Sequence, residues 1–271
     1  MQLIKKNIRK ILLLFLIPLL CALGAAFFHK TSGHKLRIGA SPLPHAEILN
    51  FVKEDLRKFD IDLEVMEFTD YVTPNVALNE QQIDANFFQH AQYMKNFARE
   101  RGVDIVSLVA VHVEPQGFYS QKIKSMDELA SGAVIAIPND PTNEGRALLL
   151  LQGNNIIKLK PGSGLECTPL DILENPKNLK FKELEAAQLP RVLPDVDGAV
   201  INGNYALEAK LIPIKDALLL EGADSPYANI VAVCREKRNT PQLQKLAEVL
   251  TSDKVKRYIL QRYNGGVVPA F

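Results

Sequence analysis

Residues 136–146 read Ala-Ile-Pro-Asn-Asp-Pro-Thr-Asn-Glu-Gly-Arg, in which an apolar run leads directly into the start of a helix. We expect a strand over 133–138 and a helix over 143–151. The N–H groups of a helix N-terminus attract anions, and the planar guanidinium of Arg146, in the first turn, suits a carboxylate bidentately. A bound carboxylate is the natural ligand of such a segment, but on this segment alone a surface pair between Arg146 and a neighbouring Glu is the preferred interpretation.

The same alternation of strand and helix continues on both sides of this unit. The stretch 105–111 is nearly continuous in apolar residues, as in strands buried on both faces of a parallel sheet. The helix expected over 44–59 places five apolar side chains on one face: Ile48, Leu49, Val52, Leu56 and Phe59. Further strands are expected at 36–40, 63–68, 83–88, 180–184, 198–201 and 230–233, and further helices at 74–81, 89–101, 125–130, 169–173, 188–193, 240–251 and 253–263.

The strand-helix units form two series, which predicts two α/β lobes with a cleft between them. We assign residues 36–113 and 230–271 to the first lobe and 114–229 to the second. The terminal helical pair would then pack back on the first lobe. Ligands of such sheets bind where the C-terminal ends of strands meet the N-termini of helices.

Composition narrows the class of protein. The chain has 271 residues, of which 47% are hydrophobic and 23% charged, so there is ample apolar material for a folded core. The formal net charge is +1, and no basic stretch is interleaved with aromatic residues. Disorder and a nucleic-acid partner are therefore excluded.

The N-terminal 28 residues have the pattern of an export signal or a membrane anchor. Basic residues (Lys5, Lys6, Arg9, Lys10) precede an uncharged apolar run from Ile11 to Phe28. Cys21 stands where a bacterial lipoprotein would receive its lipid, but the preceding Leu20 is bulkier than such signals prefer. Lipidation at Cys21, cleavage near Gly24 to Ala26 and a retained anchor all place the body of the protein outside the cytoplasm, joined through a polar linker at 29–35.

Only two cysteines, Cys167 and Cys234, remain after this segment. Two cysteines are too few for a disulfide framework. We interpret both as buried free thiols, with a single disulfide as the alternative.

Two further groups of residues lie at expected strand ends. Tyr71 and Phe88 could form the walls of an apolar slot, with His90 supplying a hydrogen bond, although aromatic residues at such positions are more often part of the core. Asn202 and Asn229 could hold the amino or carboxyl group of a zwitterion, but on this evidence alone an Asn-Gly turn or a helix cap is the preferred interpretation.

Catalytic motifs give little support for an enzyme. The sequence contains no phosphate-binding loop of the Walker type, no G-x-S-x-G and no H-E-x-x-H. His45, His90 and His112 each follow an expected strand and could meet around zinc, but no two are closely spaced. A cysteine nucleophile at Cys167 or Cys234 is the remaining alternative, with no recognisable motif around either.

Taken together, six motifs of this sequence resemble the NlpA lipoprotein family, the methionine-binding proteins of bacterial methionine ABC importers. The resemblance runs in order from about Leu36 to the C-terminus. The motifs are Asn139 to Asn143 with Gly145-Arg146, Asp70-Tyr71-Val72, Asp84 to His90, Glu174 to Leu179, Ser225-Pro226-Tyr227, and Asn264-Gly265-Gly266.

This resemblance implies a two-lobed periplasmic-binding-protein fold, similar to type II, with the ligand cleft between the lobes. It implies an exported or membrane-tethered protein, attached through lipid or an N-terminal anchor, that delivers L- or D-methionine to an ABC permease without a cofactor, a resident metal or catalysis. By this resemblance, Arg146 corresponds to the family residue that binds the α-carboxylate of the ligand. Asn202 and Asn229 correspond to residues that bind the polar backbone atoms of the ligand, and Tyr71, Phe88 and His90 to residues around its side chain.

Overall fold

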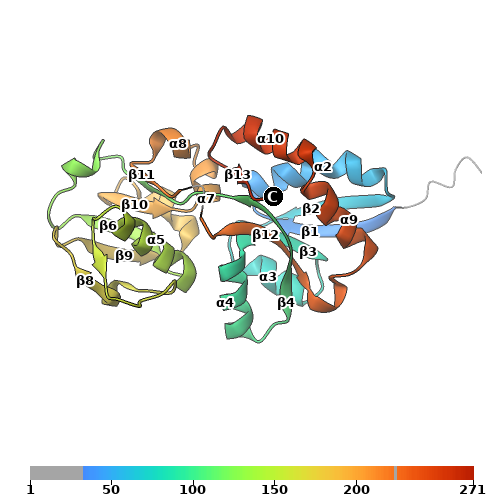
Figure 1. Ribbon diagram of the computed structural model, residues 1–271, viewed down its shortest axis with the longest axis horizontal. Coiled ribbons are helices and arrows are strands. Elements are labelled where there is room, and N and C mark those ends of the chain that lie inside the picture. The colour runs from blue at the N-terminus through green and yellow to red at the C-terminus, as the bar shows by residue number, and fades with distance from the viewer. Residues whose placement is uncertain (1–32, 223–224) are drawn as a thin grey trace, which may run out of the picture.

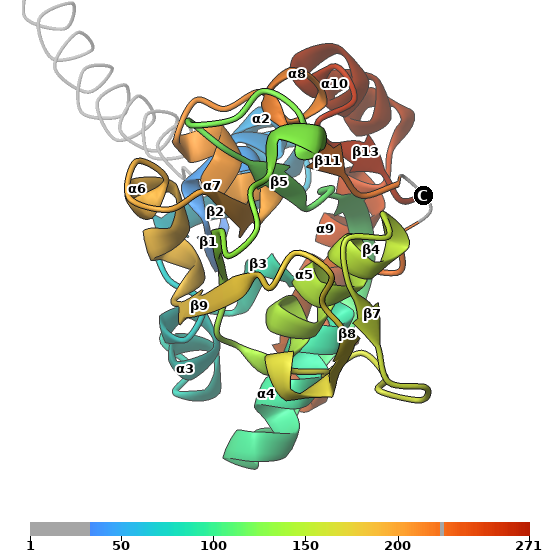
Figure 2. The same cartoon turned by 90° about the vertical axis from the view of Figure 1, so that its left-hand side faces the viewer.

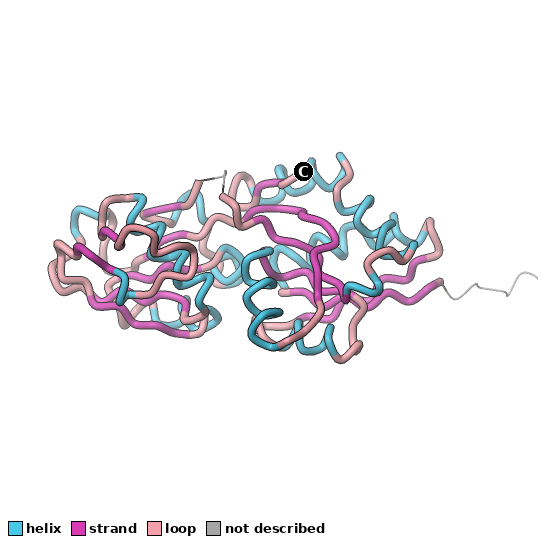
Figure 3. The backbone as a smooth tube through the Cα atoms, turned by 60° about the horizontal axis from the view of Figure 1, so that its bottom comes forward, coloured by secondary structure: helices cyan, strands magenta, loops and turns pink. Residues whose placement is uncertain are grey.

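The computed structural model describes residues 33–222 and 225–271, which form two α/β lobes side by side (Figure 1). Each lobe has its own central sheet with helices around it (Figure 3). The predicted fold class is confirmed. The predicted signal or anchor at 1–28, with Cys21, and most of the linker at 29–35 lie outside the described residues.

The sheet of the first lobe has six strands in the order β13-β4-β12-β3-β1-β2. Strand β1 pairs parallel with β2 and β3, whereas β12 pairs antiparallel with β3 and β4. The strands are β1 (His34–Ala40), β2 (Ile61–Glu67), β3 (Ala85–His90), β4 (Ile105–Val113), β12 (Ala228–Cys234) and β13 (Val268–Pro269).

The prediction that 105–111 is a parallel strand buried on both faces is wrong. Strand β4 is antiparallel to both of its neighbours, and residues 106–110 are only half-buried. Both neighbours, β12 and β13, come from the C-terminal part of the chain. An apolar run in the sequence indicates that a strand is hydrophobic, but it does not indicate whether a strand from a distant segment pairs with it in parallel or antiparallel.

The helices of the first lobe are α2 (Glu47–Arg57), α3 (Thr73–Asn79), α4 (Ala91–Arg101), α9 (Pro241–Leu250) and α10 (Asp253–Tyr263), with short helical turns at Pro42–Ala46 and Arg235–Lys237. The predicted apolar face of α2 is confirmed for Ile48, Leu49, Val52 and Leu56, which are fully buried. Phe59 is 50% exposed, because the helix ends at Arg57 and the chain then turns away. The terminal helices α9 and α10 pack into the same core as α2, as expected.

The sheet of the second lobe has five strands in the order β11-β5-β10-β6-β9. Figure 2 shows the molecule with this lobe facing the viewer. They are β5 (Gly117–Tyr119), β6 (Val134–Pro138), β9 (Lys180–Leu184), β10 (Gly198–Ile201) and β11 (Leu219–Leu220), beside the small pair β7 (Lys158–Leu159) and β8 (Ile172–Glu174). The helices are α5 (Pro141–Gly153), α6 (Leu189–Val192), α7 (Gly203–Glu208) and α8 (Pro213–Asp216), with helical turns at Met126–Glu128, Pro169–Asp171 and Ala186–Gln188.

Two predicted helices of this lobe are shorter than expected. The segment 125–130 forms only the turn at 126–128, and 169–173 forms a turn that leads into β8. Strands β5, β7, β11 and β13 have two or three residues each, too few for a periodic pattern to reveal.

The chain crosses between the lobes after β4 and returns before β12. The two crossings pair with each other, because the Glu221 N–H donates to the backbone oxygen of Gln116 at 3.0 Å. The sheets thus take their strands from 34–113, 228–234 and 268–269 on one side and from 117–220 on the other. The residue-level division of the chain at 113/114 and 229/230 stays a prediction. Within the two described ranges, no helix has the length and apolar character required to cross a bilayer.

Candidate ligand-binding site

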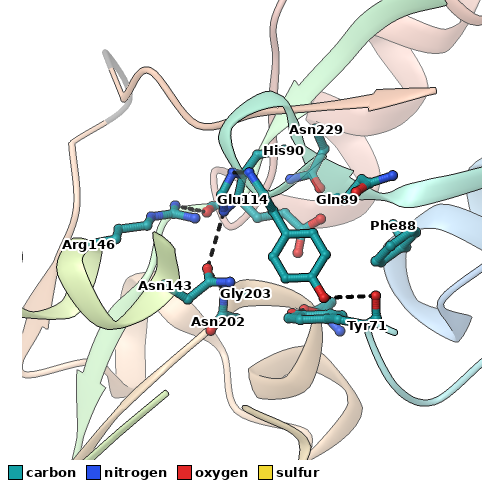
Figure 4. A pocket seen from close by; sticks show the side chains of 12 residues that line it. Tyr71, Phe88, Gln89, His90, Glu114, Asn143, Arg146, Asn202, Gly203 and Asn229 are labelled. Atoms are coloured by element: carbon teal, nitrogen blue, oxygen red, sulfur yellow. Dashed lines mark hydrogen bonds between the residues drawn. The ribbon is translucent and has the colours of Figure 1, made fainter. Parts of the chain in front are cut away.

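A pocket with an empty volume of about 310 Å³ lies between the two lobes (Figure 4). All six residues proposed from the sequence line it. The complete lining is Tyr71, Phe88, Gln89, His90, Tyr93, Glu114, Asn143, Arg146, Asn202, Gly203, Asn204 and Asn229. Sequence reasoning therefore missed six residues as individual site members. Of these, Gln89 and Asn143 lay inside motifs that had been recognised, whereas Glu114 carried no such signal.

Arg146 is a buried cation at the junction of the two lobes. Its side chain is 3% exposed, and its Nη2 donates to the backbone oxygen of Glu114 at 2.8 Å. Its Nε donates to Glu221 Oε1 at 3.1 Å, and Nη2 also pairs with Glu221. The ring of Tyr227 lies 4.4 Å from the guanidinium carbon. Arg146 does pair with a Glu, but the partner lies 75 positions further along the chain, and the pair is not on the surface.

The entry of α5 positions Arg146 and Asn143. Asp140 caps the helix by accepting a hydrogen bond from the Asn143 N–H at 3.0 Å, and Pro141 occupies the first turn. The side-chain oxygen of Asn143 then accepts from Asn202 Nδ2 at 2.7 Å. The predicted strand-to-helix unit thus delivers two polar side chains to the pocket.

Aromatic rings form one wall. Tyr71 lies with its ring centroid 5.8 Å from Phe88 and 5.7 Å from Tyr93. Phe88 is 3% exposed and belongs to the same apolar cluster as Tyr93. Tyr71 and Phe88 therefore meet as expected, and the wall also has a packing role.

His90 is the last residue of β3 and the N-cap of α4. Its Nδ1 accepts a hydrogen bond from the Tyr93 N–H at 3.1 Å, and its Nε2 donates to Asn143 Oδ1 at 3.2 Å. Burial and then the nearby Arg146 charge lower the pKa of His90 to about 3. The ring is therefore neutral at physiological pH and joins the two lobes.

The other two histidines considered for zinc do not meet His90. His45 and His112 instead face Glu114, whose Oε1 lies 3.1 Å from Nε2 of His45 and 2.8 Å from Nε2 of His112. The grouping of His45, His90 and His112 is therefore wrong. His45, His112 and Glu114 offer ligand atoms within 4.8 Å of one another, and all three are buried.

The two asparagines approach the pocket from different lobes. Asn202 follows β10, where its Oδ1 accepts from Gln116 Nε2 at 3.3 Å. Asn229 lies in β12, and its Oδ1 lies 3.2 Å from His45 Nε2. Asn202 stands at the N-cap position of α7 but its side chain makes no capping hydrogen bond, and Asn229 lies within a strand and not in a turn. Both side chains line the pocket.

Both described cysteines are free thiols. Cys167 is buried and donates to the Gly145 carbonyl oxygen at 3.6 Å, whereas Cys234 is only half-buried and donates to Leu78 at 3.5 Å. Burial raises the pKa of each thiol. This environment opposes the thiolate that a nucleophile requires, and Cys234 departs from the fully buried position expected for it.

Two lobes, a double crossing between them and a polar pocket at their junction define the class of two-lobed periplasmic substrate-binding proteins. The chain belongs to the NlpA lipoprotein family, whose pattern matches residues 36–271.

Relatives and solved structures resemble the chain over most of its length. It is 43% identical to the membrane lipoprotein TpN32 of Treponema pallidum over 86% of this chain and 87% of that protein. It is 45% identical to the D-methionine-binding lipoprotein MetQ of Escherichia coli over 82% of each. A nutrient binding protein from Burkholderia cenocepacia, solved bound to methionine, superposes with a TM-score of 0.85 at 47% identity, covering 87% of this chain and all of that one.

Proposed function

We propose that this protein captures methionine outside the cytoplasm and delivers it to the permease of an ABC importer. One observation carries the proposal: a buried guanidinium and an aromatic wall share a single pocket between two lobes. The first suits the carboxylate of an amino acid, and the second suits an unbranched, polarisable side chain such as a thioether.

Each predicted site residue has a role in this proposal. Arg146 binds the α-carboxylate, and Asn202 and Asn229 bind the polar atoms of the amino-acid backbone. Tyr71 and Phe88 enclose the thioether, and His90 holds the wall against the second lobe through Asn143. We propose no chemistry on the ligand: neither cysteine lines the pocket, and burial raises the pKa of each thiol, which opposes a thiolate nucleophile.

The relatives support both the ligand and the location. MetQ of E. coli is named a D-methionine-binding lipoprotein, and a neighbour from Coxiella burnetii is named a periplasmic substrate-binding protein of an ABC transporter. We infer a protein of the cell envelope, exported by its N-terminal segment and tethered there through lipid on Cys21. The partners are the permease and the membrane surface.

Calorimetric titration tests the proposal directly. Full-length protein in detergent, freed of co-purified ligand by unfolding and refolding, is titrated with L-methionine, D-methionine, leucine, alanine and Zn²⁺. We expect at least one methionine enantiomer to bind at least about tenfold more tightly than leucine or alanine. Mass spectrometry should recover the ligand unchanged. Tight Zn²⁺ binding without amino-acid binding would instead favour the metal-transport alternative.

A further inference from the structure

Glu114 is a buried carboxylate at the edge of the pocket. It lies in the first crossing between the lobes, directly after β4, and is 4% exposed. Among the described residues that line the pocket, Glu114 alone carries a carboxylate. A buried carboxylate requires compensation by hydrogen bonds or an opposite charge.

Two histidines supply part of that compensation. Their Nε2 atoms both contact Oε1 of Glu114, at 3.1 Å for His45 and 2.8 Å for His112. The hydroxyl of Ser41 lies 2.6 Å from His45 Nδ1, and Nδ1 of His112 is buried without a partner among the described residues. Because Nδ1 of His112 has no partner there, its ring proton lies on Nε2, which donates to Glu114 Oε1. Nε2 of His45 lies close to the same oxygen and also lies 3.2 Å from Asn229 Oδ1.

The second oxygen of Glu114 is left for a ligand. Oε2 has no hydrogen-bond donor in the described part of the chain, and it faces Gly203 at the start of α7. A Cβ at position 203 would lie 2.7 Å from Cβ and 3.1 Å from Oε2 of Glu114. Only glycine at this position leaves the carboxylate where it is. Although burial alone would raise the pKa of Glu114, the two histidines lower it to about 2, so the group is an anion.

Glu114 and Arg146 are adjacent. Arg146 Nη2 donates to the backbone oxygen of Glu114 at 2.8 Å, so an anion and a cation border the same pocket. An α-amino acid carries its carboxylate and its ammonium on one carbon atom. Its two receptors must therefore carry opposite charges within one pocket, as the side chains of these two residues do.

We propose that Glu114 binds the α-ammonium group of the ligand through Oε2, and that His45 and His112 are positioning residues that hold the carboxylate through Oε1. The inference rests on the proposed function and adds the second half of amino-acid recognition to it. Zinc coordination by the same three residues would require Nε2 of His112 to give up the proton that it donates to Glu114.

A ligand that lacks the amine distinguishes binding of the ammonium group by Glu114 from a purely structural role of Glu114. The probes are L-methionine, or its enantiomer if that binds more tightly, and 4-(methylsulfanyl)butanoic acid, which lacks only the amine. We expect the wild-type protein to prefer methionine by at least about 100-fold. Glu114→Gln should weaken methionine binding at least about 30-fold and change binding of the deaminated acid less than about threefold. The exposed Glu236→Gln is the matched control and should change neither.

The positioning role has its own pair of variants. His112→Gln keeps an N–H donor that can reach Glu114, whereas His112→Leu removes it. Methionine binding should fall about tenfold or more in His112→Leu and recover in His112→Gln, with little change for the deaminated acid in either. Equal losses for the two ligands would indicate a structural role and overturn the positioning assignment.

The outcomes distinguish this inference from the proposed function. Wild-type protein that binds neither methionine nor its deaminated analogue would disprove both. Wild-type protein that binds the two ligands equally would disprove the inference and leave methionine capture intact, and this comparison requires no variant to fold. Equal losses in Glu114→Gln, or Zn²⁺ binding that depends on Glu114, would also overturn it.

Discussion

The hydroxyl of Tyr71 in the first lobe donates a hydrogen bond of 2.5 Å to Asn204 Oδ1 in the second. Because the bond spans the lobes, it can form only while they are in contact. Tyr71→Phe keeps the aromatic wall but leaves the Asn204 oxygen without this donor. We expect methionine binding to weaken by about 0.5–1.5 kcal/mol in calorimetry. Tyr258→Phe, on α10, is the control, and an unchanged Kd in Tyr71→Phe would mean that the bond does not contribute to closure.

Arg146→Ala should weaken methionine binding by about 2–5 kcal/mol, as expected when one partner of a buried charge contact is removed. Calorimetry measures the change, with the exposed Arg57→Ala as the control. Because Arg146 also holds Glu221 and the backbone of Glu114, a thermal melt must show that the variant is folded. A loss below about tenfold would contradict carboxylate binding by Arg146.

Phe88→Ala should reduce the selectivity of the pocket. Methionine should lose several kcal/mol through lost packing, whereas alanine should lose much less because its methyl group does not reach the wall. Calorimetry with both amino acids on both proteins gives the difference, and Phe59→Ala, at a half-exposed position, is the control. Equal losses for the two amino acids would show that Phe88 supports only the fold.

Glu144 makes the stability depend on pH. Burial, followed by the nearby Glu183 and Asp140, raises the pKa of Glu144 to about 7, and its Oε1 is buried without a partner in the described part of the chain. Because the pKa of Glu144 is higher in the folded than in the unfolded protein, protonation of this group favours the folded state. That contribution to stability is complete below about pH 4.5, the pKa in the unfolded protein, and is lost as the pH rises through about 7.

Glu144→Gln should therefore stabilise the protein at pH 8 by about 1–3 kcal/mol, or about 2–4 °C in Tm for each kcal/mol, and have little effect at pH 4. Thermal melts at both pH values test this, with Glu236→Gln as the matched exposed control. The same gain at both pH values would contradict the titration of Glu144.

Lipidation at Cys21 predicts added acyl mass and partition into detergent for the processed protein. Cys21→Ser should retain the precursor N-terminus, because the modified residue is also the site of processing. Intact-mass measurement distinguishes the outcomes. Cleavage after Gly24, Ala25 or Ala26 without lipid would establish ordinary secretion instead.

Local sequence was sufficient for much of the fold and for the centre of the pocket. The buried face of α2, from Ile48 to Leu56, follows from helical spacing alone, and the strand-to-helix unit ending at Arg146 was readable because its signals lie within about ten residues. Positions at the ends of expected strands made Tyr71, Phe88 and His90 candidates, the family motifs contain all three, and the structure brings them to one pocket.

Tertiary structure decided which distant residues contact one another. Arg146 meets Glu221, and His45 and His112 meet Glu114, only because the chain crosses twice between the lobes and brings distant segments together. Phe59 fits the apolar pattern of α2 but lies beyond its end, and β4 is antiparallel because β12 returns from the second lobe. Periodicity records which face of an element is apolar, whereas long-range pairing depends on the path of the whole chain.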